Sequence, residues 1–172
     1  MEDRKPILLQ GAMQVEVKYL LENLENKTKI EIEGYNFYKG TIDNYPVVIS
    51  ETEIGSINST MATTIGILNF RPDCVINQGI AGSYDENVHK FDVVIGISCY
   101  NTNCYKTKRK EKGEGSNPLE WQIITFTDDD KEEKEISLQA DAYLLSVAKD
   151  ASSTYQKGNV HLGVLRKRRC LE

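Results

Sequence analysis

The stretch Asp73-Cys74-Val75-Ile76-Asn77-Gln78-Gly79-Ile80-Ala81-Gly82 decides the fold. Its first half, Asp73–Asn77, is short and almost wholly apolar, which is typical of a strand buried on both faces of a parallel sheet. Its second half, Gln78–Gly82, places two glycines around small or apolar residues and indicates a tight turn. The stretch therefore predicts a buried strand that runs directly into a glycine turn.

The same pattern opens the chain. Ile7–Leu9 is a short apolar run that leads to Gly11, and a helical pattern follows it. Ligands of open α/β sheets bind outside the carboxyl ends of the strands. The turns at Gly11 and Gly79 are therefore expected to open on the same side and to form two walls of one site. The helical pattern consists of Val15, Val17, Leu20, Leu21 and Leu24, at mostly three- and four-residue spacing.

The remaining segments complete an α/β architecture. Three strand-like segments with short turns between them predict a meander, and the helix after them should end ahead of Arg71-Pro72 because proline disfavours a preceding α conformation. Alternating helices and buried strands favour a three-layer α/β/α fold with a mixed central sheet. In that sheet, Ile7–Leu9, Asp73–Asn77 and Val93–Ile97 are expected to be neighbours. The predicted segments are strands at Lys29–Ile32, Tyr35–Gly40, Pro46–Ser50, Phe91–Ile97, Trp121–Phe126 and Val160–Leu165, helices at Gly55–Phe70 and Leu138–Ala148, a loop at Lys106–Pro118 and a charged connection at Asp128–Glu135.

Composition restricts the class of protein. The chain has 172 residues, of which 40% are hydrophobic and 27% charged, with a formal net charge of −5. These values are typical of one folded domain and give no basic face for nucleic acid. No apolar run approaches the ~18–20 residues of a membrane span, and the N-terminus does not resemble a signal peptide. The four cysteines lack the spacing of a metal site. The composition predicts a cytoplasmic protein with no metal, no cofactor, no nucleic-acid partner and no membrane partner.

Two motifs lie at the glycine turns, and each has an ordinary alternative. Glu16 falls in the first turn of the predicted helix, where the helix dipole stabilises a carboxylate. Acidic residues are common there, so Glu16 alone is also compatible with a simple helix start. The bare backbone of Gln78–Gly82 can support a flat ligand, but it also fits a tight turn that needs glycine.

Taken together, the motifs resemble one family. The opening of the chain, from Ile7 through Gly11-Ala12-Met13 to Glu16, is similar to that of the methylthioadenosine/S-adenosylhomocysteine nucleosidases. Glu53–Asn58, Arg71–Gly82 and Val88–Gly96 follow in the same order and resemble later segments of that family. The resemblance extends over roughly residues 7–97 and is much weaker from Ser98 to Asn159. It implies a nucleoside-phosphorylase-like fold, a purine nucleoside as substrate and a homodimer.

The resemblance also implies roles for individual residues. Glu16 matches the glutamate that orients the attacking water, and Met13 and Ile54 match residues that line the ribose and alkylthio pockets. A second set matches the segment along the nucleoside, and in this set Ile80 replaces a serine or threonine. Two further departures, at Glu53 and Ser83, replace glycines and change the packing around a substrate. The segment along the nucleoside consists of Ile80, Ala81 and Gly82.

The chemistry of N-ribosidic cleavage fits this assignment. Cleavage builds positive charge on the sugar and negative charge on the leaving purine, so a carboxylate near the anomeric carbon orients water and stabilises the cation. A phosphorylase needs basic residues to hold phosphate. The turns at Gly11 and Gly79 carry no Arg or Lys, and Glu16 repels phosphate. Hydrolysis is therefore favoured over phosphorolysis, which remains an alternative within the superfamily.

The end of the chain departs from the family. Where the purine-binding Ser-Gly-Asp segment is expected, after Leu165, the sequence instead continues Arg166–Glu172. We expect residues 1–165 to be a C-terminally truncated domain, without its last strands and C-terminal helix, and residues 166–172 to be an aberrant tail. A frameshift explains such a tail, and a domain cut by design is the rival explanation. Arg166–Arg169 also permits a nucleic-acid or targeting patch, although four basic residues decide little.

Two functions follow from this expectation. The first is a nucleosidase that is either inactive as these 172 residues alone or completed by another chain, because none of their acidic residues falls in the family's purine-side motif. The second is a non-catalytic nucleoside-binding or interaction module that keeps the fold.

Overall fold

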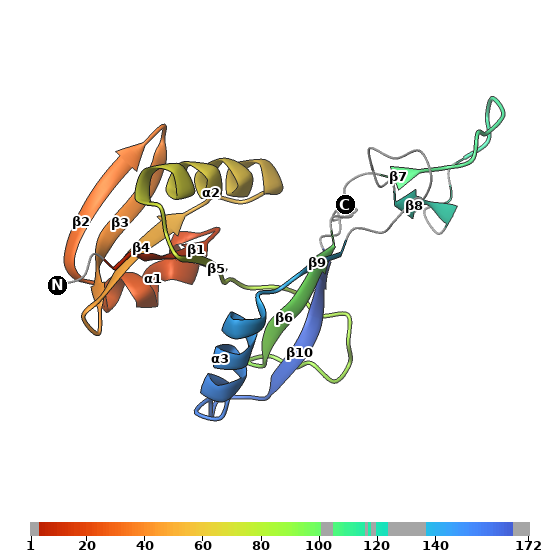
Figure 1. Ribbon diagram of the computed structural model, residues 1–172. Coiled ribbons are helices and arrows are strands. Elements are labelled where there is room, and N and C mark those ends of the chain that lie inside the picture. The colour runs from red at the N-terminus through yellow and green to blue at the C-terminus, as the bar shows by residue number, and fades with distance from the viewer. Residues whose placement is uncertain (1–3, 101–104, 116, 118–119, 124–136, 167–172) are drawn as a thin grey trace. The chain divides into compact units, whose positions relative to one another are not determined.

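The computed structural model describes residues 4–100, 105–115, 117, 120–123 and 137–166 (Figure 1). The chain divides into two compact units, residues 1–82 and 83–172. The first unit holds a five-stranded sheet, and the second holds a three-stranded sheet and a two-stranded sheet.

The sheet of the first unit is mixed. Its strand order is β2-β3-β4-β1-β5, in which β4, β1 and β5 are parallel and β2, β3 and β4 form an antiparallel meander. Both turns of the meander have two consecutive residues with positive φ, Glu33-Gly34 and Asp43-Asn44, as tight two-residue hairpins require. The predicted meander and the predicted pairing of Ile7–Leu9 with Asp73–Asn77 are confirmed. The strands are β1 (Ile7–Gly11), β2 (Glu25–Ile32), β3 (Tyr35–Ile42), β4 (Tyr45–Glu51) and β5 (Cys74–Asn77).

Two helices, α1 (Gln14–Glu22) and α2 (Ser56–Phe70), cover opposite faces of this sheet (Figure 1). Val47 and Ile49 of β4 pack with Val17 of α1. Val48 lies between them in the sequence, points to the other face and packs with Leu8. Leu8 in turn lies beneath Gly66 of α2. The alternation places one helix on each face, which confirms the predicted three-layer α/β/α fold.

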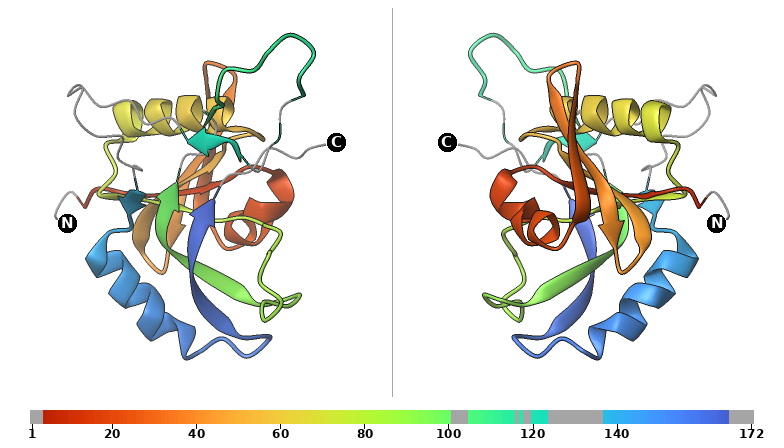
Figure 2. Two further views of the ribbon diagram at one scale, coloured as in Figure 1. Left: turned by 90° about the vertical axis from the view of Figure 1, so that its right-hand side faces the viewer. Right: turned by 90° about the vertical axis from the view of Figure 1, so that its left-hand side faces the viewer.

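The three-stranded sheet of the second unit has the order β10-β6-β9. β6 (Val93–Tyr100) runs parallel to β10 (Val160–Arg166) and antiparallel to β9 (Ser137–Gln139), and α3 (Ala142–Ser152) packs beside β6 (Figure 2). The expectation that Val93–Ile97 lies in one sheet with Ile7–Leu9 and Asp73–Asn77 is wrong. β6 instead pairs with β10 along its whole length and with β9 at Ser98–Tyr100, in a sheet separate from that of β1 and β5.

The helix predicted at Leu138–Ala148 begins later than expected. Residues 137–139 form β9, and α3 starts at Ala142 after Asp141, whose Oδ1 accepts a hydrogen bond from the Leu144 N–H at 2.9 Å. Aspartate at an N-cap satisfies an otherwise unpaired helix donor, so it sets the helix start.

Other sequence predictions in the second unit are tested only in part. Tyr105–Lys106 (β7) pairs with Gln122–Ile123 (β8), so the predicted strand at Trp121–Phe126 is confirmed at residues 122–123, while 124–126 lie outside the described residues. The predicted charged connection at Asp128–Glu135 also lies outside the described residues. Residues 167–172 of the predicted tail lie outside them as well.

A buried carboxylate connects the start of β6 to the start of β10. The Asp92 side chain is 3% exposed and accepts hydrogen bonds from the N–H groups of His89 at 2.9 Å and Asn159 at 2.7 Å, and it bonds His161 Nε2 at 2.9 Å. These hydrogen bonds, those from the two backbone N–H groups first, hold the pKa of Asp92 well below its usual range. Asp92 therefore stays ionised and holds the loop before β6 against β10.

Candidate functional site

The carboxyl ends of β4, β1 and β5 meet at one edge of the first unit's sheet. Gln10 is in register with both Ser50 and Asn77. Beyond the strands, the Thr52 N–H donates to the Gly11 carbonyl and the Gln78 N–H donates to the Gln10 carbonyl, each at 2.9 Å. The turns at Gly11 and Gly79 therefore open at the same edge, as the sequence predicts.

Glu16 lies at this edge in the first turn of α1. Its Oε2 accepts a hydrogen bond from the Met13 N–H at 2.9 Å, which is the carboxylate half of a capping box. Its Oε1 accepts a second hydrogen bond, at 2.7 Å, from the N–H of Ile80 in the turn after β5. Two backbone donors thus hold a half-buried carboxylate near the positive end of a helix. Each carboxylate oxygen keeps a lone pair that is able to accept a proton from water.

The two glycines of the turns make room for this carboxylate. A Cβ on Gly79 would lie 2.6 Å from Glu16 Oε1, and a Cβ on Gly11 would lie 3.1 Å from Glu16 Cβ and 2.8 Å from Val17 Cγ1. Neither glycine has a positive φ. The requirement for glycine at both positions is therefore the close approach of Glu16 and its helix.

The other predicted site residues lie at or after the same edge, with different degrees of contact to Glu16. Met13 and Ile80 bond Glu16 through their backbones, and their side chains are 36% and 76% exposed. Ile54 follows β4 by three residues and is 71% exposed. Ala81 and Gly82 follow Ile80 and are exposed. The structure thus connects Glu16 to Met13 and Ile80 by hydrogen bonds. Ile54 lies in the segment that follows β4, and Ala81 and Gly82 lie in the segment that follows β5.

The sequence does not predict a role for the side chain of Gln78. Its side-chain Nε2 donates to the main-chain carbonyl of Glu16 at 2.6 Å. The only sequence signal was an amide directly before the glycine turn, and amides are common in turns.

Beneath the edge lies a small polar region on the α2 side of the sheet. Gln10 and Ser50 are 2% and 0% exposed, and Thr63 of α2 donates its hydroxyl to Gln10 Oε1 at 3.0 Å. Gln10 Nε2 and Ser50 Oγ have no hydrogen-bond partner among the described residues. On the opposite face, the Tyr38 hydroxyl donates to Glu51 Oε1 at 3.3 Å, and burial followed by the Glu51 charge raises the pKa of Tyr38. Tyr38 is therefore a protonated donor at neutral pH.

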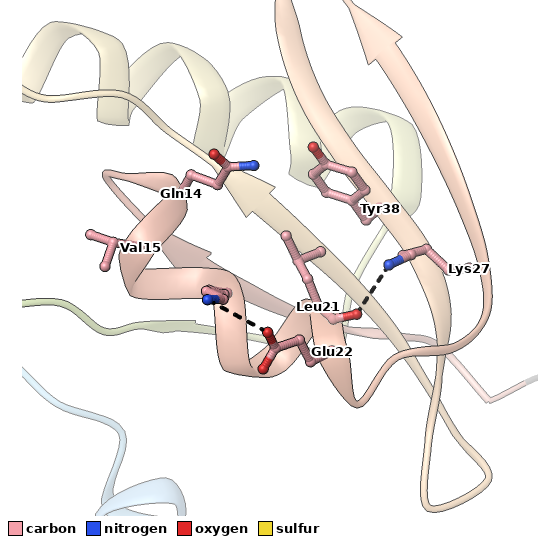
Figure 3. A pocket seen from close by; sticks show the side chains of 7 residues that line it. Gln14, Val15, Leu21, Glu22, Lys27 and Tyr38 are labelled. Carbon is pink, nitrogen blue, oxygen red and sulfur yellow. Dashed lines mark hydrogen bonds and ion pairs between the residues drawn. The ribbon is translucent and has the colours of Figure 1, made fainter.

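A shallow hollow of about 540 Å³ lies between α1 and the β2–β3 hairpin (Figure 3). Its lysines are engaged locally: Lys27 Nζ donates to the Leu21 carbonyl at 3.2 Å, and Lys18 lies 3.8 Å from Glu22. None of the predicted site residues lines it, so the edge at Glu16 remains the candidate site. The lining residues are Gln14, Val15, Lys18, Leu21, Glu22, Lys27 and Tyr38.

Within the described part of the chain, no group of three or more His, Cys, Asp or Glu residues is arranged to hold a metal ion. No helix within the same residues is long and apolar enough to cross a membrane.

Comparison with known proteins identifies the family. The model of the phosphorylase superfamily matches residues 6–165. A 5'-methylthioadenosine/S-adenosylhomocysteine nucleosidase of an Exiguobacterium species is 33% identical over 158 residues, which cover 90% of this chain and 60% of that protein. The nucleosidase of Pseudoalteromonas translucida is 45% identical over 85 residues, which cover 49% of this chain and 36% of that protein.

Solved structures agree on the fold. The nucleosidase of Neisseria meningitidis in complex with methylthio-immucillin-A superposes with a TM-score of 0.74 and 25% identity, covering 94% of this chain and 64% of that one. The nucleosidase of Colwellia psychrerythraea in complex with adenine gives a TM-score of 0.76 at 23% identity, covering 96% and 63%. The chain spans at most about two thirds of the length of these relatives. The family match over residues 6–165 and the shared fold show that the chain belongs to the phosphorylase superfamily and is similar to its methylthioadenosine/S-adenosylhomocysteine nucleosidases.

Proposed function

We propose that the chain carries the water-side half of a purine nucleoside N-ribosyl hydrolase that releases adenine from 5'-methylthioadenosine or S-adenosylhomocysteine. The observation that carries the proposal is the placement of Glu16. Its carboxylate is held by the N–H groups of Met13 and Ile80 at the carboxyl edge of three parallel strands. Ligands of open α/β sheets bind at such an edge.

Glu16 is suited to act on water and on the sugar. A carboxylate that two backbone donors fix in place needs little reorganisation when positive charge develops at the anomeric carbon. It also accepts a proton from the attacking water. The purine-side acid is a separate requirement, and the family resemblance assigns it to no residue of these 172. The resemblance in the sequence and the relatives' names supply the substrate class.

Hydrolysis is favoured over phosphorolysis by the charge at the edge. Gly11 and Gly79 and their immediate neighbours include no Arg or Lys. Phosphate binding requires basic side chains or several free N–H donors, and here the N–H groups of Met13 and Ile80 are already bonded to a carboxylate. A phosphate ion therefore meets negative charge at this position.

The apolar residues near Glu16 are proposed as substrate contacts. Met13 and Ile54 offer exposed side chains for an alkylthio group, and the exposed segment Ile80–Gly82 offers backbone and small side chains to a nucleoside. One similar nucleosidase structure contains methylthio-immucillin-A and another contains adenine. We infer a purine nucleoside as the ligand and a homodimer as the assembly.

The test is adenine release from 5'-methylthioadenosine, measured by chromatography with and without phosphate. We expect the 172 residues alone to release no adenine above background, because none of their acidic residues falls in the purine-side motif that the family resemblance implies. We expect a polypeptide extended after residue 165 by fusion of a relative's C-terminal segment to release adenine and free methylthioribose without phosphate. Release that requires phosphate would identify a phosphorylase. Robust release by the 172 residues would mean that another carboxylate serves as the acid.

A second candidate function is nucleoside binding without turnover. It is favoured by the same absence of an assignable purine-side acid among these residues. Saturable binding of methylthioadenosine to the extended polypeptide, with no adenine released, would support this function over hydrolysis.

A further inference from the structure

The main-chain carbonyl of Glu16 receives a hydrogen bond that its helix does not provide. Gln78 Nε2 donates to this oxygen at 2.6 Å, from a residue directly after β5. Within the helix the same carbonyl accepts the N–H four residues later, so Gln78 uses its second lone pair. The contact therefore connects the end of β5 to the helical turn that bears Glu16.

Gln78 and Ile80 hold Glu16 at two points. Gln78 bonds the backbone of Glu16, and the Ile80 N–H bonds its Oε1 at 2.7 Å. Gly79 lies between the two donors, and its missing side chain lets Oε1 come close, since a Cβ would stand 2.6 Å away. The start of this turn is itself fixed, because the Gln78 N–H donates to the main-chain carbonyl of Gln10 in β1 at 2.9 Å.

The hydrogen bond from the Met13 N–H to the carboxylate does not fix Glu16 relative to the sheet. The Met13 N–H belongs to the same helical turn as Glu16, so its bond to Oε2 orients the side chain relative to the helix only. The position of the carboxylate relative to the sheet edge depends on the turn after β5. We propose that Gln78 is a positioning residue: its amide holds the first turn of α1 against the sheet edge so that the Ile80 N–H stays bonded to Glu16. The catalytic meaning of this role rests on the proposed function.

The test uses the chain of 172 residues and needs no activity. A backbone amide that donates to a carboxylate changes its proton chemical shift when the carboxyl group is protonated, because a charge-assisted bond becomes a neutral one. The amide shifts of Met13 and Ile80 are followed by NMR as pH falls. Both are expected to titrate together, and both titrations should disappear in Glu16→Gln.

The decisive variant is Gln78→Met, which keeps the length of the side chain and removes the donor. Its matched control is Gln14→Met, the same change at an exposed residue of the first turn of α1 that lines the hollow between α1 and the β2–β3 hairpin. In Gln78→Met the Ile80 amide should lose most of its pH-dependent shift while the Met13 amide keeps its own. In Gln14→Met both shifts should persist. If Gln78→Met does not fold, Gln78→Asn, which shortens the reach by one methylene, is judged by the same criterion.

Two results would overturn the proposal: an Ile80 shift that survives in the Gln78 variant, or an Ile80 amide that does not titrate in the parent chain. Neither result concerns adenine release. The proposed function fails separately, if the extended polypeptide releases adenine equally well with and without the Glu16 carboxylate.

Discussion

At the scale of single residues, Glu16 is positioned by main-chain groups and by space. Two N–H donors and one amide hold it, and two glycines leave room for it. The sequence predicted Glu16 and both glycine turns, because an acidic first turn and a strand–glycine pattern are local signals. It did not predict the role of Gln78, because a contact between a turn and a carbonyl 62 residues away leaves no local pattern.

Gly79→Ala should separate the position of Glu16 from the stability of the fold. The added Cβ would meet Glu16 Oε1, the end of a flexible side chain, so the carboxylate moves and the backbone does not. We expect the Ile80 amide to lose its pH-dependent shift, while the free energy of unfolding falls by no more than about 1.5 kcal/mol, the net worth of one hydrogen bond. In the control Gly82→Ala, where a Cβ meets nothing within 4 Å, the shift should persist. An unchanged Ile80 shift in Gly79→Ala would contradict this account.

At the scale of elements, strands and helices with local signals were predictable and their partners were not. The meander, α2 and β5 have apolar periods and turn residues that act within a few positions. The start of α3 differs from the prediction because Asp141 caps the helix, and apolar periodicity does not include that capping signal. The pairing of β6 with β10 joins segments far apart in the chain, and nothing local distinguishes β10 from β5 as its neighbour.

Gly66→Ala tests the packing of α2 on the sheet. Alanine normally stabilises a helix interior relative to glycine by about 1 kcal/mol. Here the added Cβ would stand 2.8 Å from Leu8 Cδ2 and 3.3 Å from Phe37 Cε1, inside the core. We therefore expect the free energy of unfolding to fall, by roughly 1–3 kcal/mol, as overpacking does. Thr64→Ala, at an exposed position of the same helix, should leave it nearly unchanged or raise it. A Gly66→Ala variant as stable as the parent in urea would show that α2 does not lie this close to Leu8.

At the scale of the whole molecule, the two units depend on different interactions. Two apolar clusters, one on each face of its sheet, stabilise the first unit. In the second unit, the Asp92 carboxylate accepts hydrogen bonds from the His89 and Asn159 N–H groups and bonds the His161 ring. The prediction of a single domain over residues 1–165 stays a prediction, as does the truncation. Sequence alone identified the family because most of the motifs that carry the resemblance lie in the first unit, and only Val88–Gly96 lies in the second.

The second unit should lose stability in acid through Asp92. The folded-state pKa of Asp92 is lowered, so its contribution is present above the ordinary aspartate value near about pH 4 and is lost as pH falls toward the folded value. Asp92→Asn should therefore be less stable than the parent at neutral pH, with a shallower decline as pH falls below about 4. Melting temperatures across this range give the comparison. Equal slopes in both proteins would exclude Asp92 as a source of the acid sensitivity.

Sedimentation tests the proposed homodimer. α2 contains no charged residue and exposes apolar side chains, with Ile57 80% and Leu68 71% exposed. If a second copy covers them, Ile57→Lys should shift the chain toward monomer. The control Val147→Lys, at an exposed apolar residue of α3, should not. A strict monomer at high concentration would remove the dimer from the account.

The central claim is that Glu16 acts on the water side of an N-ribosidic cleavage, and its most direct test is the rate of adenine release in the extended polypeptide. Glu16→Gln keeps the size of the side chain and removes the charge. We expect the rate to fall by roughly 10²–10⁴, the usual contribution of a positioned general base. Glu22→Gln, the same change at the exposed end of α1, should keep the parent rate. A Glu16→Gln variant that releases adenine at the parent rate would contradict the claim and leave Glu16 as a helix-start residue.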